Sequence, residues 1–267
     1  MAVGAAMTGR PVICHMMFAN FLYNGFDAIA NQAAKLRLMT GGQVRLPVTF
    51  VAVMGGGSST AAQHSDSPHP VVMNLGGVNV VVPATPADAK GLMKTAVRGT
   101  DPTVFLIPRS RGGTLGEVPD GDHLVPFGKA TLHRSGGDVT IVAIGSAVNH
   151  ALTAANMLAE QGINAEIVDP RTLVPLDEAT ILASVAKTGR LIVVDEARDI
   201  CSAASHIAAV VADRGFQSLK APIRRVTVPN VAMPYAPALE KALLPDPAKI
   251  FAVSMELVGS ERRERRA

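Results

Sequence analysis

Aromatic residues are scarce in this sequence of 267 residues, which has no tryptophan and only 4% Phe, Trp and Tyr together. The core must therefore be filled by Ala, Val, Ile and Leu, as it is in parallel sheets that are buried on both faces. Charged residues are also few, at 18%, whereas 48% of the residues are hydrophobic. This balance excludes a disordered chain and predicts a folded α/β protein with a large core.

Cysteine is scarce as well, because Cys14 and Cys201 are the two in the chain and they show no metal-ligand spacing. That usage predicts a reducing, cytoplasmic compartment. No apolar run reaches the roughly 18 residues of a membrane span, so we expect no membrane association. The net charge is only +3 and the basic residues are not interleaved with aromatics, so we expect no nucleic-acid partner.

Short apolar runs alternate with helical patterns along most of the chain. This alternation predicts βαβ units with parallel sheets flanked by helices. A turn-rich stretch interrupts it, and we therefore predict a first domain over residues 1–115, a linker over 116–137 and a second domain over 138–267. Strands are expected at 12–14, 48–54, 78–82, 103–107, 139–144, 165–168, 191–194 and 223–228, and helices at 24–39, 85–98, 146–161, 175–187, 202–214 and 247–258.

One polar loop follows the apolar run 48–54 and is the first candidate for chemistry. It begins with three consecutive glycines, 55–57, which let the backbone bend sharply and let a ligand approach closely. It then carries His64, whose imidazole can gain or lose a proton near neutral pH. Polar loops at the ends of buried strands are where open α/β folds place their sites, although a flexible surface loop would have the same composition.

Other patterns favour structural roles. Gly145 stands without the remaining glycines of a dinucleotide fingerprint, so the start of the helix at 146 is expected to be structural. His69 lies five residues after His64, but no third ligand for zinc is evident. Asp120-Gly121-Asp122 falls in the turn-rich stretch and is interpreted as a turn. The adjacent acids Asp195 and Glu196 are expected to cap the following helix, although a functional role is the alternative.

A set of motifs in order along the chain resembles one family, the beta subunits of the decarboxylase component of 2-oxoacid dehydrogenases. That family includes the pyruvate, branched-chain and acetoin dehydrogenases. Each motif is weak alone, but jointly they are specific and cover nearly the whole chain. The matching segments are FANF at 18–21, DAIANQAAK at 27–35, GGQ at 41–43, QHS at 63–65, PATPADAKGL at 83–92, RTLVPLD at 171–177, TGRLIVVDE at 188–196 and PYAPALE at 234–240.

The resemblance implies a transketolase-like pyrimidine-binding domain followed by a transketolase C-terminal domain. Members of the family assemble with an alpha subunit into α₂β₂ heterotetramers that share thiamine diphosphate, with Mg²⁺ held by the alpha subunit. The implied reaction is oxidative decarboxylation of a small 2-oxo acid, with pyruvate expected, and acyl transfer to a lipoyl group on the acyltransferase core. A transketolase or deoxyxylulose-phosphate synthase fragment is the alternative of the same fold, but its own diphosphate motif is absent here.

The same resemblance assigns two site residues. Phe21 matches the aromatic residue that contacts the aminopyrimidine ring of the cofactor, and His64 matches the active-site histidine that transfers protons around the 2-oxo acid adduct. Some members also bind potassium through main-chain carbonyls. The matching positions here are Val48, Ala96, Gly99 and Asp101, with Gly99 in place of a usual acid.

One departure from the family bears on activity. Family members begin some tens of residues earlier, with a glutamate that bonds the pyrimidine ring, whereas no acidic residue precedes Asp27 here. The pyrimidine-binding domain is therefore expected to be incomplete at its N-terminus. Two roles follow from this: a working enzyme subunit, or a non-catalytic or truncated assembly module of the same complex.

Overall fold

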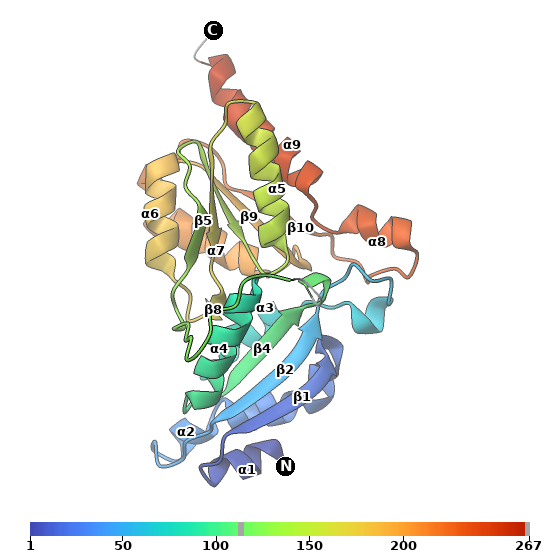
Figure 1. Ribbon diagram of the computed structural model, residues 1–267, viewed down its shortest axis with the longest axis vertical. Helices are drawn as coiled ribbons and strands as arrows, with labels where there is room; N and C mark the ends of the chain where they lie inside the picture. Colours follow the sequence, from blue (N-terminus) through green and yellow to red (C-terminus); the bar gives the residue numbers. More distant parts are fainter. Residues whose placement is uncertain (112–114, 265–267) are drawn as a thin grey trace. The chain divides into compact units, whose positions relative to one another are not determined.

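The computed structural model describes residues 1–111 and 115–264, and the chain divides into two compact units (Figure 1). The first unit comprises Met1–Lys129, Arg171–Leu176 and Ala232–Lys241. The second comprises Ala130–Pro170, Asp177–Val231 and Ala242–Ala267. Each unit contains a five-stranded, mainly parallel sheet with helices around it, which confirms the predicted fold class.

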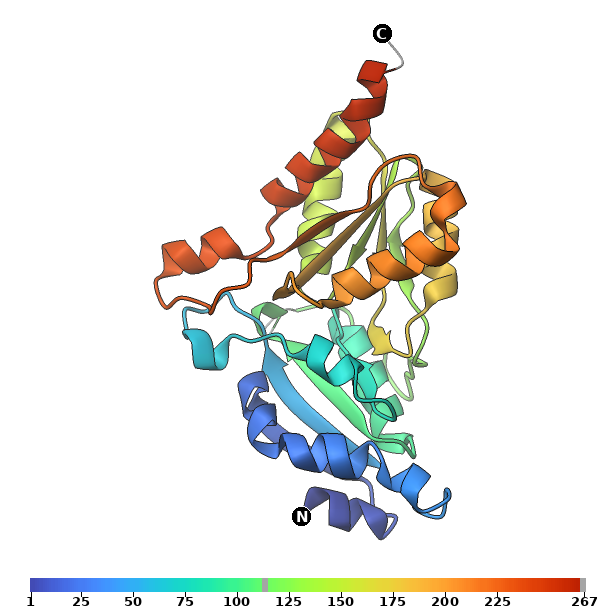
Figure 2. The same ribbon diagram turned by 180° about the vertical axis from the view of Figure 1, so that it is seen from behind.

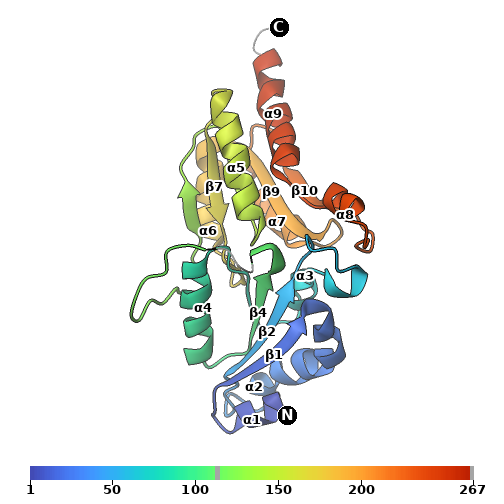
Figure 3. The ribbon, with the colours of Figure 1, turned by 45° about the vertical axis from the view of Figure 1, so that its right-hand side comes forward.

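The sheet of the first unit has the strand order β1-β2-β4-β3-β8. Figure 3 shows β1, β2 and β4 side by side. The first four strands are parallel, and β8 pairs antiparallel with β3. We expected no strand at β8, because a three-residue strand that pairs with a distant edge leaves no periodicity in the sequence. The strands are β1 (Val12–Phe18), β2 (Val48–Met54), β3 (Asn79–Val81), β4 (Thr103–Pro108) and β8 (Thr172–Val174).

Most helices of this unit are short. The helix expected over 24–39 is instead three consecutive pieces, a 3₁₀ helix, a π helix and an α-helix. The wider π turn is visible in the bond from the Ala34 amide to the Ile29 carbonyl, five residues back, at 3.0 Å. The elements are α1 (Ala2–Met7), η1 (Ala19–Gly25), η2 (Ala28–Ala33), α2 (Leu36–Met39), η3 (Ala62–His64), α3 (His69–Met73), α4 (Pro86–Arg98), η4 (Arg109–Arg111) and α8 (Pro237–Leu243).

Helix α4 begins where the sequence predicts. The Thr85 hydroxyl accepts a hydrogen bond from the Asp88 amide at 3.0 Å and donates to the Asp88 carboxylate at 2.6 Å. This cap satisfies one of the amides that the first helical turn leaves unpaired. The helix then packs Leu92 and Ala96 against Phe105 of β4 in the core of the unit.

The sheet of the second unit has the order β10-β9-β6-β7-β5, with β5 antiparallel to β7 and the other pairs parallel. Helix α5 packs beside α9, and α7 packs beside α6, as Figures 1 and 2 show. Strand β5 lies within the segment 116–137, so part of that segment belongs to this sheet. The elements are β5 (Thr131–Arg134), β6 (Val139–Ala143), α5 (Ala147–Glu160), β7 (Ala165–Asp169), α6 (Glu178–Thr188), β9 (Leu191–Arg198), α7 (Ala203–Arg214), η5 (Phe216–Ser218), β10 (Arg224–Val228) and α9 (Pro247–Glu264).

Two details of the second unit differ from expectation. Helix α6 begins at Glu178 rather than 175, because the Asp177 carboxylate accepts the Thr180 amide at 3.2 Å and caps the helix. Asp195 and Glu196 do not cap the next helix, since both lie inside the longer strand β9. Ser202 caps α7 instead, accepting the Ser205 amide at 3.1 Å.

Glu166 on β7 is a buried carboxylate whose protonation is coupled to the stability of the second unit. Burial by itself raises its pKa, but hydrogen bonds from Lys187, Ser184 and the Gly136 amide, with the charge of Lys187, lower it below the usual 4.5 overall. A lowered folded-state pKa means that Glu166 stabilises the fold above pH 4.5 and that this contribution is lost as the pH falls through the folded-state value.

We therefore expect the free energy of unfolding of the Glu166→Gln variant to depend less on pH, between pH 7 and 3, than that of the unmodified chain. Denaturant unfolding followed by far-UV circular dichroism measures this difference. The matched control is Glu256→Gln, since the Glu256 side chain is 68% exposed. Equal pH dependence of the Glu166→Gln variant and the unmodified chain would contradict the expectation.

Candidate functional site

The residues of the candidate site follow the ends of three neighbouring strands, at one edge of the first sheet. Strands β1, β2 and β4 are adjacent and parallel, so their carboxyl ends meet at the same edge. Phe21 follows β1 on η1, His64 follows β2 on η3, and Arg109 follows β4. This is the edge at which open α/β sheets bind ligands.

Two aromatic rings surround the imidazole of His64. The ring centroids of Phe18 and His64 are 4.6 Å apart with an interplanar angle of 81°, and those of Phe21 and His64 are 5.5 Å apart at 77°. Phe18 and Phe21 also meet edge to face, at 5.9 Å. The three side chains are each partly exposed. The structure therefore brings the two predicted residues, Phe21 and His64, together and adds Phe18.

Arg109 ties the loop that carries His64 to this aromatic cluster. Its guanidinium lies 5.0 Å from the centre of the Phe18 ring, a cation–π distance. Its Nη1 donates to the Thr60 hydroxyl at 2.7 Å and to the His64 carbonyl at 3.3 Å. The Thr60 hydroxyl also lies 3.2 Å from that of the buried Ser65. These contacts restrict the backbone on both sides of His64.

A second set of bonds joins the loop to η1. The Asn20 amide group donates to the Asp66 carboxylate at 2.8 Å and to the Ala62 carbonyl at 3.2 Å. The Asp66 backbone amide donates back to the Asn20 side-chain oxygen at 3.2 Å. The Asp66 carbonyl in turn accepts the Gly55 amide at 2.9 Å, which closes the loop on itself.

Sequence reasoning did not assign roles to Phe18, Asn20 or Arg109. Phe18 and Asn20 lie in the motif that carried the resemblance, so a signal for them was present. Arg109 follows its strand directly, and its position at a strand end was the available signal. Its contacts with Thr60 and His64 join segments about 45 residues apart, and no local pattern reports such pairings.

The four positions suggested for potassium lie at the other end of the sheet. Val48 opens β2, Ala96 and Gly99 lie at the end of α4, and Asp101 precedes β4. The Ala96 carbonyl accepts the Gly99 amide at 3.2 Å, as an ordinary helix end does, and the Asp101 carboxylate pairs with Arg37. Potassium binding at these positions stays a prediction.

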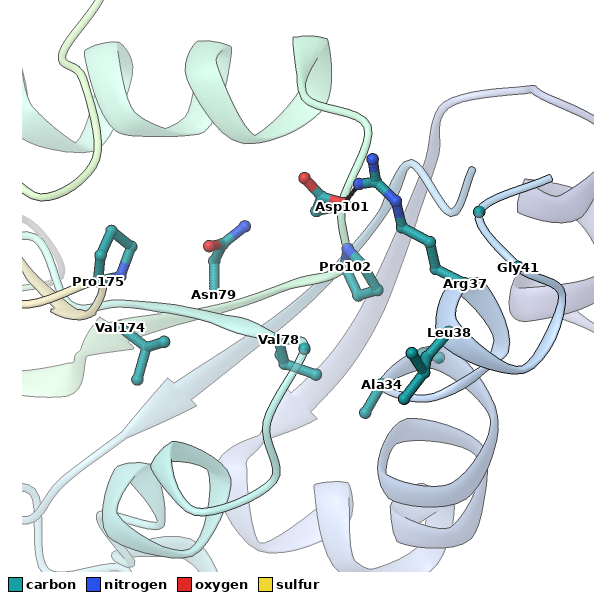
Figure 4. Close-up of a pocket in the computed structure, with 13 residues that line it drawn as sticks. Ala34, Arg37, Leu38, Gly41, Val78, Asn79, Asp101, Pro102, Val174 and Pro175 are labelled. Atoms are coloured by element: carbon teal, nitrogen blue, oxygen red, sulfur yellow. Dashed lines mark hydrogen bonds and ion pairs between the residues drawn. The ribbon is translucent and has the colours of Figure 1, made fainter. Parts of the chain in front are cut away.

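A cavity of about 650 Å³ opens beside that ion pair (Figure 4). Figure 4 shows Arg37 and Asp101 at one side of it, and Val174 and Pro175 at the other, with Asn79 between them. Apolar side chains form most of its wall. Its lining residues are Ala33, Ala34, Arg37, Leu38, Gly41, Gly42, Gly77, Val78, Asn79, Asp101, Pro102, Val174 and Pro175.

The remaining acidic candidates of the sequence have structural partners. Asp122 bonds Arg98 at 2.7 and 2.8 Å and Lys94 at 2.6 Å, and these bonds hold its pKa well below the usual range. The Asp195 carboxylate accepts the Ala197 amide at 2.9 Å, and Glu196 accepts a bond from Ser146. Across residues 1–111 and 115–264, no three His, Cys, Asp or Glu side chains gather as metal ligands would.

Nor does any helix in the described part of the chain have the length and apolar character needed to cross a membrane.

Comparisons with known proteins match both units. Residues 1–113 match the pyrimidine binding domain of transketolase, and residues 128–250 match the transketolase C-terminal domain. The chain is 46% identical over 258 residues to the acetoin:2,6-dichlorophenolindophenol oxidoreductase subunit beta of Bacillus subtilis, covering 97% of this chain and 75% of that protein. It is 38% identical over 259 residues to the pyruvate dehydrogenase E1 component subunit beta of the same organism, covering 97% and 79%.

Among solved structures, the chain is similar to a split gene transketolase described as an inactive beta4 tetramer. The TM-score is 0.79 at 27% identity, and the match covers 97% of this chain and 79% of that one. Matched domain models and relatives above 30% identity extend over nearly the whole chain. The chain therefore belongs to the family of E1 beta subunits of the acetoin, branched-chain and pyruvate dehydrogenase complexes.

Proposed function

We propose that this chain is the beta subunit of a thiamine-diphosphate-dependent 2-oxoacid dehydrogenase, active with an alpha subunit in an α₂β₂ heterotetramer. The reaction is the oxidative decarboxylation of a small 2-oxo acid, with pyruvate as the expected substrate, and transfer of the acyl unit to a lipoyl group. The observation that carries this proposal is the cluster of His64, Phe21 and Phe18 at the carboxyl edge of the sheet. Membership of the E1 beta family supports it.

The residues of this edge fit the aminopyrimidine end of thiamine diphosphate. Phe21 is a partly exposed aromatic ring, and such a ring can stack on a flat heterocycle. When bound, the cofactor supplies a nucleophilic carbon that adds to the ketone and takes up the electrons left by CO₂. Mg²⁺ and the diphosphate would be held by the alpha subunit, and potassium by the carbonyls of the four positions named above.

His64 would hold and move the proton near the reacting carbon. An imidazole can both donate and accept a proton. His64 would therefore donate to the sulfur that leaves as the S–S bond of the lipoyl disulfide opens, and would accept the proton that the substrate's hydroxyl loses as the acyl group forms. Its partial exposure leaves one side open to substrate, while Phe18, Phe21 and the backbone contacts of Arg109 restrict its position.

The proposed partners are the alpha subunit and the lipoyl acyltransferase core, and the proposed compartment is the cytoplasm. Two free cysteines support a reducing environment, since Cys14 is partly buried, Cys201 is exposed and neither forms a disulfide. Cys14 lies on β1, an edge strand whose residues alternate between partly buried and exposed.

We expect CO₂ release from pyruvate when this chain is co-expressed with an alpha-type subunit from the same organism and supplied with thiamine diphosphate and Mg²⁺. The chain alone should give none, because the diphosphate motif is absent from its sequence. A stable complex without decarboxylation of any 2-oxo acid would favour the alternative, a non-catalytic or truncated assembly module.

Acetoin is the second candidate substrate. The identity to the acetoin oxidoreductase subunit beta is 46%, compared with 38% to the pyruvate dehydrogenase subunit of the same organism. The same co-expressed complex distinguishes the two, because acetoin cleavage consumes acetoin without releasing CO₂. Turnover of acetoin at a higher kcat/KM than pyruvate would assign the complex to the acetoin branch of the family.

A further inference from the structure

The last segment of the first unit returns from far along the sequence to the loop that carries His64. Residues 232–241 belong to this unit, and α8, which begins within them, carries Glu240. Figures 1–3 show α8 beside the loop that follows β2. The Glu240 side chain is charged yet buried, with the residue only 3% exposed.

Hydrogen bonds from the loop replace the water that the buried Glu240 carboxylate has lost. One oxygen accepts the Gly57 amide at 2.9 Å. The other accepts the Ser59 amide at 2.8 Å and its hydroxyl at 3.2 Å. Buried charges persist where several hydrogen bonds replace water, and bonds to a charged acceptor are stronger than neutral ones.

The loop needs such support because its backbone is strained. Ser59 has a φ of 52° and Ala61 a φ of 62°, both in the left-handed region that residues with a Cβ rarely adopt. Such conformations persist when the surroundings specify them, and they concentrate at functional sites. The η3 turn that ends at His64 begins directly after Ala61, so the strained backbone that Glu240 contacts leads into the turn that carries the imidazole.

We propose that Glu240 is a positioning residue for His64, acting through the backbone of residues 57–61. This inference rests on the function proposed above only for its catalytic consequence. The structural part, a buried carboxylate that sets the loop and thereby the imidazole, stands on the contacts alone. Glu240 touches neither His64 nor a reacting atom, which separates its role from that of a catalytic residue.

The first test uses the Glu240→Gln variant of the full chain and NMR. A glutamine oxygen can accept one loop amide, but its NH₂ group then faces the other donor. We expect the Gly57 and Ser59 amides to exchange with solvent at least about tenfold faster, consistent with the loss of a charge-assisted bond. The ring signals of His64 should shift or broaden. The control is Glu256→Gln, an exposed acid in α9, which should leave both unchanged.

Two outcomes would overturn the proposal: unchanged exchange at Gly57 and Ser59, or faster exchange there with unchanged His64 ring signals. Should Glu240→Gln fail to fold, Ser59→Gly is the second variant. It removes the hydrogen bond from the Ser59 hydroxyl to Glu240, and it relieves the backbone strain of a left-handed residue that has a Cβ. Its His64 ring signals should also shift, and unchanged signals would contradict the proposal.

The second test uses the complex with the alpha subunit. Glu240→Gln should lower kcat by about tenfold to hundredfold with little change in KM, because the imidazole is displaced while substrate contacts remain. Wild-type kcat in a variant with displaced His64 signals would overturn the catalytic consequence. If the unmodified complex does not turn over any 2-oxo acid or acetoin, the proposed function fails, while the NMR result still decides the positioning role.

Discussion

Replacement of His64 by alanine is expected to lower kcat for acyl transfer to the lipoyl group by about 10²- to 10⁴-fold in the assembled complex. The affinity for thiamine diphosphate should change far less. The imidazole is the titratable group at the carboxyl edge of the sheet that lies against both Phe18 and Phe21. Alanine removes the proton carrier but leaves Phe21, the ring proposed to contact the cofactor.

The measurement is a comparison of lipoyl acylation rates with cofactor titrations on the same preparations. The matched control is His206→Ala, because His206 lies exposed on α7 in the second unit. Overall turnover equal to that of the unmodified complex, with equal cofactor affinity, would remove His64 from the catalytic machinery. A loss confined to cofactor binding would make it a binding residue instead.

Replacement of Gly136 by alanine is expected to destabilise the second unit by about 3 kcal/mol or more, through overpacking that cannot relax. Gly136 lies between β5 and β6, and its amide donates to Glu166 at 3.2 Å. A Cβ there would lie 2.3 Å from the Ala165 carbonyl carbon and 2.4 Å from the Asn164 oxygen. Both are backbone atoms at the start of β7, so no side chain can move aside.

The neighbouring glycine supplies the control. A Cβ on Gly137 would meet nothing within 4 Å, so Gly137→Ala should change stability by no more than about 1 kcal/mol, in the stabilising direction if its backbone suits alanine. Far-UV circular dichroism in urea is the measurement, because the chain has no tryptophan to report unfolding. Similar urea midpoints of unfolding for the two variants would contradict the expectation, because they would show that the backbone can make room for a Cβ at Gly136.

Much of the fold could be predicted from local patterns. The apolar run 48–54 became β2 with the predicted bounds, and the Thr85 cap started α4 as predicted. Short β-rich runs and capping residues act over a few positions, so the sequence alone carries their signal. The broken helix at 24–39 escaped prediction, because 3₁₀, π and α turns share similar apolar spacing over so short a length.

Only part of the candidate site could likewise be predicted from the sequence. The glycines at 55–57, His64 and Phe21 were identifiable from composition and from motifs in order along the chain. The residues that contact the loop around His64 were not, since Arg109 and Glu240 lie 45 or more positions away in the sequence from the residues they bond.

The sequence by itself therefore determined the alternation of strands and helices, the family and His64 as the candidate reactive side chain. Only the tertiary structure decided which partners orient that side chain. The return of residues 232–241 to the first unit, and of β8 to the edge beside β3, are examples. The physical reason is that periodicity and capping are properties of neighbouring residues, whereas a buried carboxylate finds its donors only after the chain has packed.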